Sequence, residues 1–348
     1  MTPPLLCTHP FNWLEIHGDG SVFVCCPAWL RRPVGNLLQQ SLQEIWHGER
    51  IVELRKSTTN GSFHHCSPKR CPFLAQALAP NRSIDDHGNP VTTWDEITDP
   101  RLRQAIEKHQ FRPDFGPTIL NLCYDPRCNL ACPSCRTELV QLTEPEQQRV
   151  EELTQRIVDQ LAPHVRQLRL SGHGDPFAAP GYRNLLQTVS RQSFPALQTI
   201  HLHTNGLLWT PATWHKMAHL HPYVRSAEIS IDAATPDTYR LNRGADFNRL
   251  LQNLGFIQSL GLDLLLSFVV QHNNFREMPG FVALANRFGA RCYFSPLINW
   301  GSWSQEAYQQ RAVHRPQHAE HGELLELLHE LNGRDGVNLG SLRALTRG

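Results

Sequence analysis

The stretch TILNLCYDPRCNLACPSCR, residues 118–136, decides how the chain is interpreted. Its first part, residues 118–124, is a short apolar run that predicts a buried strand. Cysteines follow directly with the spacing C-x3-C-x2-C, at Cys128, Cys132 and Cys135. Structural zinc sites take four ligands and disulfides take pairs, so an odd number of clustered thiols indicates a site with one position left open. We therefore expect a ligand site in the loop after this strand.

Length and composition limit the classes of protein to consider. The 348 residues suit one large domain or two, and 40% apolar residues allow a sizeable core. A net charge of +1 gives no overall attraction to nucleic acid or anionic membranes, so nucleic acid is an unlikely partner. We see neither a membrane-spanning run nor a signal peptide, and we expect a cytoplasmic protein with reduced thiols. Clustered cysteines there more often bind metals or do chemistry than form disulfides.

A rhythm of strands and helices begins near Thr118. The predicted strands are residues 118–124, 167–172, 197–204, 226–232, 262–271 and 291–298, and the helices between them are 143–163, 180–192, 211–220, 238–260 and 275–289. Such alternation implies parallel pairing with right-handed crossovers, hence an α/β fold. Six units suit a partial (β/α)6 barrel better than the closed form with eight. In either barrel the site lies at the carboxyl ends of the strands.

The remaining segments define the expected domain organisation. Residues 1–80 are a small cysteine-rich module with a predicted hairpin over 10–26 and a helix over 41–56, for which Ser41 and Glu44 have capping-box spacing. The domain boundaries that we expect are 1–80 for the module, 81–117 for a connector with a short helix at 100–109, 118–300 for the barrel, and 301–348 for a C-terminal extension with a helix at 319–331.

The three-cysteine spacing at the end of the first barrel strand resembles the radical SAM superfamily. The resemblance implies a [4Fe–4S] cluster held by Cys128, Cys132 and Cys135, whose open iron binds S-adenosylmethionine (SAM). It also implies reductive cleavage of SAM to a 5′-deoxyadenosyl radical, with a low-potential flavodoxin or ferredoxin as reductant. Ser134 stands where many members carry an aromatic residue, which is a departure. The alternative is a zinc site with a distant fourth ligand.

The same resemblance implies which residues contact SAM. His173, Gly174 and Asp175 stand where the family has its Gly-Gly-Glu segment, and polar residues follow the later strands in the same way. The expected cofactor contacts are Gly174, Asp175, Thr204, Asn205, Ser230, Asp232, Arg243, Ser267 and Gln271. Among them we expect Asp232 to bond the ribose and Arg243 to pair with the SAM carboxylate. The alternative is an ordinary glycine turn and ordinary polar strand ends.

A second cysteine pattern lies in the N-terminal module. Cys7, Gly20 and Cys25 are spaced like the opening of SPASM and twitch domains, which accompany many radical SAM enzymes. The resemblance implies a twitch-like module with one auxiliary [4Fe–4S] cluster, held by Cys7, Cys25, Cys66 and Cys71. Cys26 is an alternative to Cys25, and a four-cysteine zinc knot is the alternative to the cluster. In the family the module usually follows the barrel, whereas here it precedes it.

The expected function is therefore that of a radical SAM enzyme acting by hydrogen-atom abstraction, assisted by an auxiliary cluster. SPASM and twitch enzymes suggest a ribosomally made peptide or protein as the substrate. A small metabolite, sugar or nucleoside is the alternative substrate, and a zinc-stabilised binding scaffold is the alternative from another class. Cys123, near the end of the first barrel strand, is either a catalytic hydrogen-atom donor or a buried structural thiol. Cys292 is expected in the core.

Overall fold

The structure is a computed structural model that describes residues 5–67, 71–77, 90–170 and 172–347. Parts of the predicted module and connector, and residue 171 of the segment before Asp175, lie outside the described residues. The chain divides into two compact units, which are described one at a time. The first comprises residues 1–125, 142–173 and 184–199, and the second comprises 126–141, 174–183 and 200–348.

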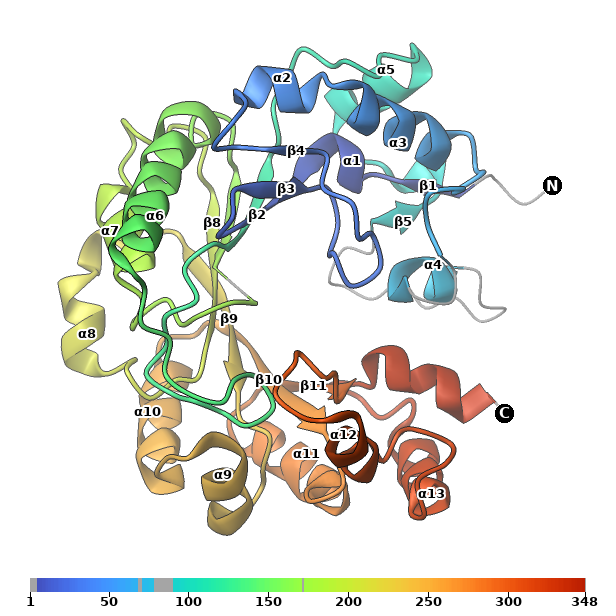
Figure 1. The fold of residues 1–348 in the computed structure, drawn as a ribbon, viewed down its shortest axis with the longest axis vertical. Helices are drawn as coiled ribbons and strands as arrows, with labels where there is room; N and C mark the ends of the chain where they lie inside the picture. Colours follow the sequence, from blue (N-terminus) through green and yellow to red (C-terminus); the bar gives the residue numbers. More distant parts are fainter. Residues whose placement is uncertain (1–4, 68–70, 78–89, 171, 348) are drawn as a thin grey trace. The chain divides into compact units, whose positions relative to one another are not determined.

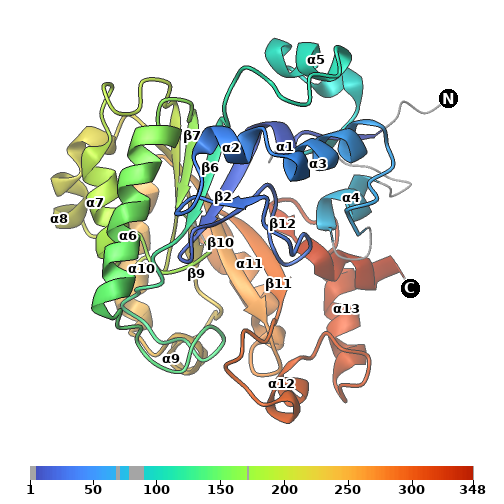
Figure 2. The same ribbon diagram turned by 45° about the horizontal axis from the view of Figure 1, so that its top comes forward.

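In the first unit, the N-terminal module shares a sheet with the start of the barrel. The strand order is β7-β6-β2-β3-β4, with bounds Gln167–Leu170, Ile119–Cys123, Trp13–His17, Ser21–Phe23 and Gly35–Asn36. Strands β2 and β3 are antiparallel, so the predicted hairpin is confirmed, and Gly20 occupies its turn with φ of 81°. Strand β2 also pairs in parallel with β6 (Figure 2), which places His17 opposite Cys123.

Short helices and one pair of strands make up the rest of the described part of residues 1–117, including the helix predicted in the connector. They are α1 (His9–Asn12), α2 (Leu42–Trp46), α3 (Glu49–Thr59), α4 (Pro72–Ala77) and α5 (Pro100–Glu107), and β1 (Leu6–Cys7) pairs antiparallel with β5 (Val91–Thr92). The capping box of Ser41 and Glu44 is confirmed at the start of α2. The single predicted helix over 41–56 is wrong, because Gly48 has extended backbone and separates α2 from α3. A Cβ at Gly48 would lie 2.9 Å from the Glu44 carbonyl oxygen.

The segment expected as a connector contributes to the core of the first unit. The buried side chains of Ile97, Leu102 and Ile106 pack against Leu6 and Phe11. The fully buried guanidinium of Arg55 donates hydrogen bonds to the carbonyl oxygens of Pro10, Trp46 and Phe111. Residues on both sides of the cysteine-rich segment are therefore held together by apolar packing and by one buried cation.

The predicted alternation of strands and helices is present (Figure 1). After β6 the elements are α6 (Glu144–Arg156) with a π-turn (Ile157–Leu161), β7, α7 (Pro180–Thr188), β8 (Thr199–Thr204), α8 (Pro211–Lys216), β9 (Val224–Ser230), α9 (Pro236–Arg243), α10 (Phe247–Ser259), β10 (Asp263–Val270), α11 (Met278–Arg287) and β11 (Arg291–Pro296). The single helix predicted over 238–260 is wrong, because Gly244 ends α9 with φ of 67°. The fold is mixed α/β with parallel strands, as expected of a partial (β/α)6 barrel.

In the second unit the strand order is β8-β9-β10-β11-β12, and these neighbouring strands are parallel. The predicted C-terminal helix is α13 (His321–Leu331). Sequence reasoning missed α12 (Gln305–Arg311) and the short strand β12 (Val337–Asn338). No helix in the described part of the chain combines the length and apolarity needed to cross a membrane.

Candidate functional site

The three cysteines of the loop after β6 lie in the second unit. The loop turns tightly at its end, since the backbone N–H groups of Cys135 and Arg136 both donate to the Cys132 carbonyl oxygen, at 2.8 and 2.9 Å. Cys132 is buried, Cys128 is half-buried and Cys135 is exposed. Three neighbouring thiols that differ in burial can each bind a different iron atom of one cluster.

Hydrogen-bond donors face each of these sulfur atoms. Cys128 Sγ accepts from the Leu130 N–H at 3.4 Å and from Asn205 Nδ2 at 3.6 Å. Cys132 Sγ accepts from Arg243 Nη1 at 3.7 Å, and Cys135 Sγ accepts from Arg136 Nε and Nη2, each at 3.4 Å. Burial, with the charge of Asp175 adding to it, raises the pKa of the Cys128 thiol to about 11. Amide and guanidinium donors favour sulfur in the anionic form that a metal cluster requires, so this donor set fits an iron–sulfur cluster.

Asp175 ties the end of β8 to the cysteine loop. Its buried carboxylate accepts hydrogen bonds from the Thr204 hydroxyl at 2.7 Å, the Asn205 N–H at 3.0 Å and the Phe177 N–H at 2.9 Å. Its own N–H donates to the Arg127 carbonyl oxygen at 3.0 Å. Burial raises the pKa of Asp175, and the bond from Thr204 opposes that shift. The Thr204 and Asp175 side chains thus engage each other, and Gly174 precedes them with φ of 77°.

Asn205 connects β8 directly to the first cysteine. Besides contacting Cys128, its Nδ2 donates to Asn129 Oδ1 at 2.9 Å, and its Oδ1 accepts from the Leu207 N–H at 3.0 Å. Sequence reasoning missed Asn129, which lies between the first two cysteines and gave no separate signal. The side chain of Asn205 is buried and held at three points, so its orientation toward the sulfur is fixed.

A buried ion pair between Arg243 and Asp232 contacts the second cysteine of the loop, Cys132. Arg243 Nη2 lies 2.8 Å from Asp232 Oδ2, and the other terminal nitrogen of Arg243 contacts Cys132 Sγ. Asp232 Oδ1 accepts the Val269 N–H at 2.7 Å, and Asp232 itself has φ of 60°. Although burial lowers the pKa of Arg243, the charges of Asp232 and Cys132 raise it above its usual range. Arg243 is therefore a fixed cation between a carboxylate and a predicted cluster ligand.

The other predicted contacts occupy two further places in the second unit. The hydroxyls of Ser230 and Ser267 lie 3.3 Å apart, and Ser230 also bonds His203 Nε2 at 2.7 Å. His203 lies 3.5 Å from the Glu228 carboxylate and was missed, although its alternation with His201 in TIHLHT places both on one strand face. Gln271 lines a pocket that also includes Ser134, the residue at the position where the family pattern is broken.

The pocket at Gln271 joins the cysteine loop to the strand ends. Its lining residues are Pro133, Ser134, Leu241, Asn242, Gln271, Asn273 and Arg311. Within the described residues, the buried Gln271 Oε1 has no hydrogen-bond partner. All nine predicted cofactor contacts lie in the second unit. Asn205 and Arg243 contact Cys128 and Cys132, and Asp175 and Asp232 contact Asn205 and Arg243 in turn.

Four cysteines of the first unit line a single apolar pocket. Cys7, Cys25, Cys66 and Cys71 share it with the aromatic rings of Trp29, Phe63 and Phe73. Trp29 Nε1 donates to Cys25 Sγ at 2.8 Å, and the Leu74 N–H donates to Cys71 Sγ at 3.4 Å. Burial raises the pKa of Cys25 well above its usual value, and Cys7 and Cys71 add to the shift. Cys25, and not Cys26, is among the described residues that line the pocket.

Two further cysteines were singled out by the sequence. Cys123 is buried at the end of β6, where burial, followed by the charges of Glu15 and Cys26, raises the pKa of its thiol. Asn121 Nδ2 donates to it at 3.5 Å. Its role as a hydrogen-atom donor stays a prediction. Cys292 is buried in β11, so the prediction that it lies in the core is confirmed.

Comparison with known families agrees with this geometry. The model of the radical SAM superfamily matches residues 124–285, which begin at the cysteine loop. Residues 124–285 are thus similar to radical SAM domains. A model described as an iron–sulfur cluster-binding domain, SPASM, matches residues 7–72. A radical SAM domain uses a [4Fe–4S] cluster with SAM, and a SPASM domain carries auxiliary iron–sulfur clusters, so both cofactor classes belong to this chain.

Similar solved structures are distant in sequence. A structure of SuiB from Streptococcus suis bound to its precursor peptide SuiA is 13% identical, with 85% of this chain and 64% of that chain covered at a TM-score of 0.41. A structure of anSMEcpe with AdoMet and the Cp18Cys peptide is 16% identical, with 62% and 58% covered at 0.44. A structure of TYW1 with a lysine–pyruvate adduct is 17% identical, with 62% and 72% covered at 0.34. The chain thus spans less than two thirds of the length of the first two. No curated protein matches the sequence.

Proposed function

We propose that this chain is a radical SAM enzyme that cleaves SAM reductively and modifies its substrate by hydrogen-atom abstraction. The observation that carries the proposal is the C-x3-C-x2-C loop at the start of the radical SAM match, with an N–H donor facing each sulfur. When bound and reduced, the cluster supplies the electron that releases a 5′-deoxyadenosyl radical from SAM. The residues of the chain hold, orient and shield these groups.

We assign the cluster ligands to Cys128, Cys132 and Cys135. In this assignment Asn205 and Arg243 orient two of the thiolates and partly neutralise them. Asp175 acts indirectly, because its carboxylate accepts hydrogen bonds from the Thr204 hydroxyl and the Asn205 N–H and so positions Asn205 beside Cys128. Arg243 and Asp232 hold each other, so the Arg243 charge remains in place whether or not a SAM carboxylate is present.

We assign the binding of SAM to the strand ends of the second unit. The contacts in this proposal are Gly174, Asp175, Thr204, Asn205, Ser230, Asp232, Arg243, Ser267 and Gln271. The unpaired Oε1 of Gln271 offers an acceptor in the pocket beside Ser134. An acceptor there suits a ligand N–H or O–H group, which both the adenine and the ribose of SAM supply.

We assign one auxiliary [4Fe–4S] cluster to Cys7, Cys25, Cys66 and Cys71. The support is that these four thiols line one pocket whose other walls are mostly apolar. Four protein thiolates complete the coordination of a cube, so this cluster serves electron transfer rather than chelation of the substrate. The clusters need reduced thiols, and we accordingly propose a cytoplasmic enzyme supplied by a flavodoxin or a ferredoxin.

The substrate class that we propose is a ribosomally made peptide or protein. The support is the SPASM match, since such domains accompany many peptide-modifying radical enzymes. A small metabolite, sugar or nucleoside is the second candidate. The polar sheet face formed by His203 of β8 with Glu228 and Ser230 of β9 favours a hydrogen-bonding substrate of either kind. A zinc-stabilised scaffold without catalysis is disfavoured by the two iron–sulfur family matches.

Anaerobic reconstitution tests the proposal. The reconstituted chain should bind about eight irons, four for each cube. Incubation with SAM and dithionite should release 5′-deoxyadenosine, and omission of dithionite should abolish this product. Zinc without iron, or intact SAM after incubation of the iron-loaded protein, contradicts the proposal. Peptides encoded by neighbouring genes, analysed by mass spectrometry beside small-metabolite mixtures, then separate the two substrate classes.

A further inference from the structure

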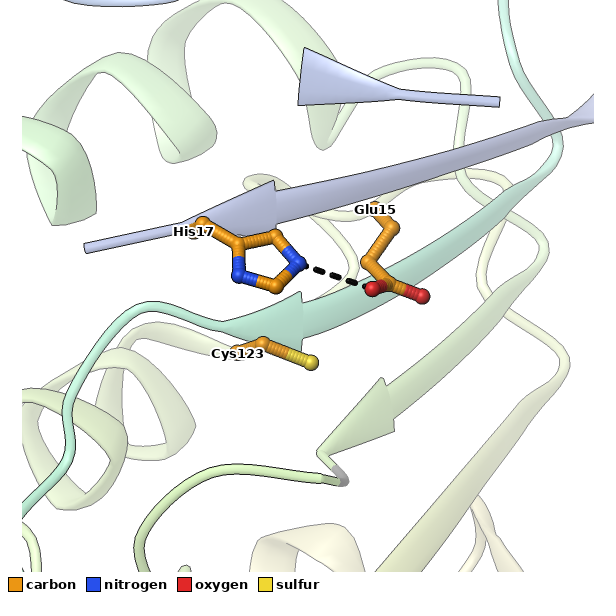
Figure 3. A group of neighbouring side chains, drawn as sticks. All are labelled: Glu15, His17 and Cys123. Carbon is orange, nitrogen blue, oxygen red and sulfur yellow. Dashed lines mark hydrogen bonds and ion pairs between the residues drawn. The ribbon is translucent and has the colours of Figure 1, made fainter. Parts of the chain in front are cut away.

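A group of three different metal-binding side chains lies in the first unit, and none of the three is among the predicted cluster ligands. Glu15 and His17 come from β2 and Cys123 comes from β6 (Figure 3). Parallel pairing sets His17 opposite Cys123, and Glu15 opposite Asn121. Because side chains alternate along a strand, all four residues project from the same face of the sheet. The backbone therefore fixes this group without help from any loop.

The ligand atoms of the three residues are close together and largely buried. One oxygen of Glu15, one ring nitrogen of His17 and the sulfur of Cys123 all lie within 4.8 Å of one another. Glu15 is 5% exposed, and so is Cys123. His17 Nε2 and Glu15 Oε1 are 2.8 Å apart, while Asn121 Nδ2 donates to Glu15 Oε2 at 2.9 Å. Each ligand is thus already directed at a common point, as the close-up view shows.

We propose that Glu15, His17 and Cys123 form a mononuclear site for a divalent transition metal, with zinc as its simplest occupant. Carboxylate, imidazole and thiolate are the ligand types that zinc takes in proteins. Three protein ligands leave a fourth position for water or for an oxygen donor of a substrate. Zinc sites with three protein ligands and an open fourth position are typically catalytic, whereas structural zinc sites have four protein ligands.

The fit of the ion requires only side-chain movement. Zinc bonds of about 2.0–2.3 Å place tetrahedral ligands about 3.3–3.8 Å apart. The three ligand atoms now lie within 4.8 Å of one another, and His17 Nε2 and Glu15 Oε1, 2.8 Å apart, would separate as their contact is replaced by two bonds to the metal. His17 is the most exposed of the three, with a side chain 29% exposed, so the ion enters from its side.

Two neighbours support a cation at this point. Among the described residues, His17 is the one basic side chain that pairs with the buried Glu15 carboxylate. A metal would neutralise that carboxylate and the Cys123 thiolate together, which one imidazole cannot do. Asn121 would keep its bond to Glu15 Oε2 and hold the carboxylate in orientation, as outer partners of metal ligands do.

The assignment also bears on Cys123 as a hydrogen-atom donor. A thiol that binds a metal loses its proton, and a metal-bound thiolate has no S–H bond to give. The two roles of Cys123 therefore exclude each other, and zinc occupancy decides between them.

The test uses the enzyme with its cysteine sites loaded with iron. After treatment with a mild chelator, it is dialysed against one equivalent of zinc chloride, and zinc and iron are counted per chain. The wild type should retain about one zinc beside its iron. Glu15→Gln and Cys123→Ser should each lower zinc retention at least about tenfold with iron content unchanged, since each removes one ligand.

The chain offers a matched control. His272, His318 and Glu320 form a second group with ligand-binding geometry, but His272 is exposed. His318→Ala should leave the zinc content unchanged. Loss of zinc in His318→Ala, with retention in Cys123→Ser, overturns the proposal, and so does a wild type that binds no zinc.

X-ray absorption at the zinc edge of the wild type removes any dependence on how the variants fold. The expected result is a zinc ion bound by one sulfur atom and otherwise by nitrogen or oxygen atoms. Two or more sulfurs mean that zinc has entered a cysteine cluster site, and no sulfur means that it sits on the surface. Either result contradicts the assignment.

Discussion

The two groups of cysteines in this chain present the same atom, sulfur, in environments of different polarity. The loop thiols of the second unit face polar and charged donors from Asn205, Arg243 and Arg136. The thiols of the first unit line a pocket of aromatic and aliphatic side chains, and Trp29 supplies a side-chain donor there. Sequence spacing distinguishes three ligands from four, whereas the structure distinguishes a polar environment from an apolar one.

This difference indicates a division of roles. Charged donors close to the loop thiols, with an unpaired Gln271 acceptor in the adjoining pocket, suit a cluster that must bind a polar molecule. An apolar pocket with four thiols suits a closed cluster, because burial away from water restricts its exchange with solutes.

The largest effect is expected from removal of the loop thiols. In the variant Cys128→Ala/Cys132→Ala/Cys135→Ala, formation of 5′-deoxyadenosine should fall below detection and iron should drop from about eight to about four per chain. The remaining iron should still give an iron–sulfur absorption band. Anaerobic product analysis with iron determination measures both. Persistent SAM cleavage would show that the loop does not hold the catalytic cluster.

The next prediction separates two adjacent cysteines of the first unit. Cys25→Ser should lose the auxiliary cluster, because Cys25 lines the pocket and accepts the Trp29 N–H. Cys26→Ser should keep the cluster, because Cys26 does not line the described pocket. Burial raises the pKa of both thiols, to about 11 for Cys26, so the pKa does not distinguish the two cysteines. Iron content and electron paramagnetic resonance of the reduced proteins provide the measurement. The reverse pattern would assign Cys26 as the ligand.

A third prediction concerns the buried cation beside the loop. Arg243→Ala leaves the carboxylate of Asp232 buried without its partner, which should reduce the free energy of unfolding by about 3–5 kcal/mol. Arg240→Ala, on the same helix, breaks an ion pair between two exposed side chains and should change it by less than about 1 kcal/mol. Anaerobic urea unfolding of both variants measures the difference. Equal effects would mean that the Arg243 pair contributes no more than a surface pair.

The sequence predicted the regular strands and helices better than the breaks between helices and the pairing of distant strands. Alternating apolar strands and amphipathic helices indicated every barrel strand, since burial imposes those periods on the sequence. The breaks at Gly48 and Gly244 were missed because a glycine within a helical pattern is compatible with continuation of the helix. The parallel pairing of β2 with β6 was also missed, since it joins residues about a hundred positions apart and leaves no local signal.

The candidate site was predictable at the level of residue type. Cysteine spacing indicated both thiol groups, and the order of strand ends indicated Asp175, Asn205, Asp232 and Arg243. It did not indicate that Asp175 and Thr204 bond each other, or that Asp232 and Arg243 do, because partners among polar side chains depend on three-dimensional packing. Glu15 and His17 were missed for the same reason, since their significance depends on Cys123 on a neighbouring strand.

The smallest predicted effect addresses the side-chain donor in the apolar pocket. Trp29→Phe removes the N–H that donates to Cys25 Sγ at 2.8 Å and keeps an aromatic ring near Phe73. Hydrogen bonds to cluster sulfurs favour the reduced, more negative state, so the midpoint potential of the auxiliary cluster should fall by on the order of tens of millivolts. Iron content should not change, because no ligand is lost.

Potentiometric titration followed by electron paramagnetic resonance measures this shift, and the exposed Trp300 supplies the control. Trp300→Phe should leave the potential unchanged, because its side chain is 66% exposed and lies in the other unit. A shift in Trp29→Phe of the opposite sign would mean that altered solvent access, rather than the lost N–H, governs the cluster. Burial, and not hydrogen bonding, would then set the midpoint potential of the auxiliary cluster, whereas the loop thiols of the second unit accept several side-chain hydrogen bonds.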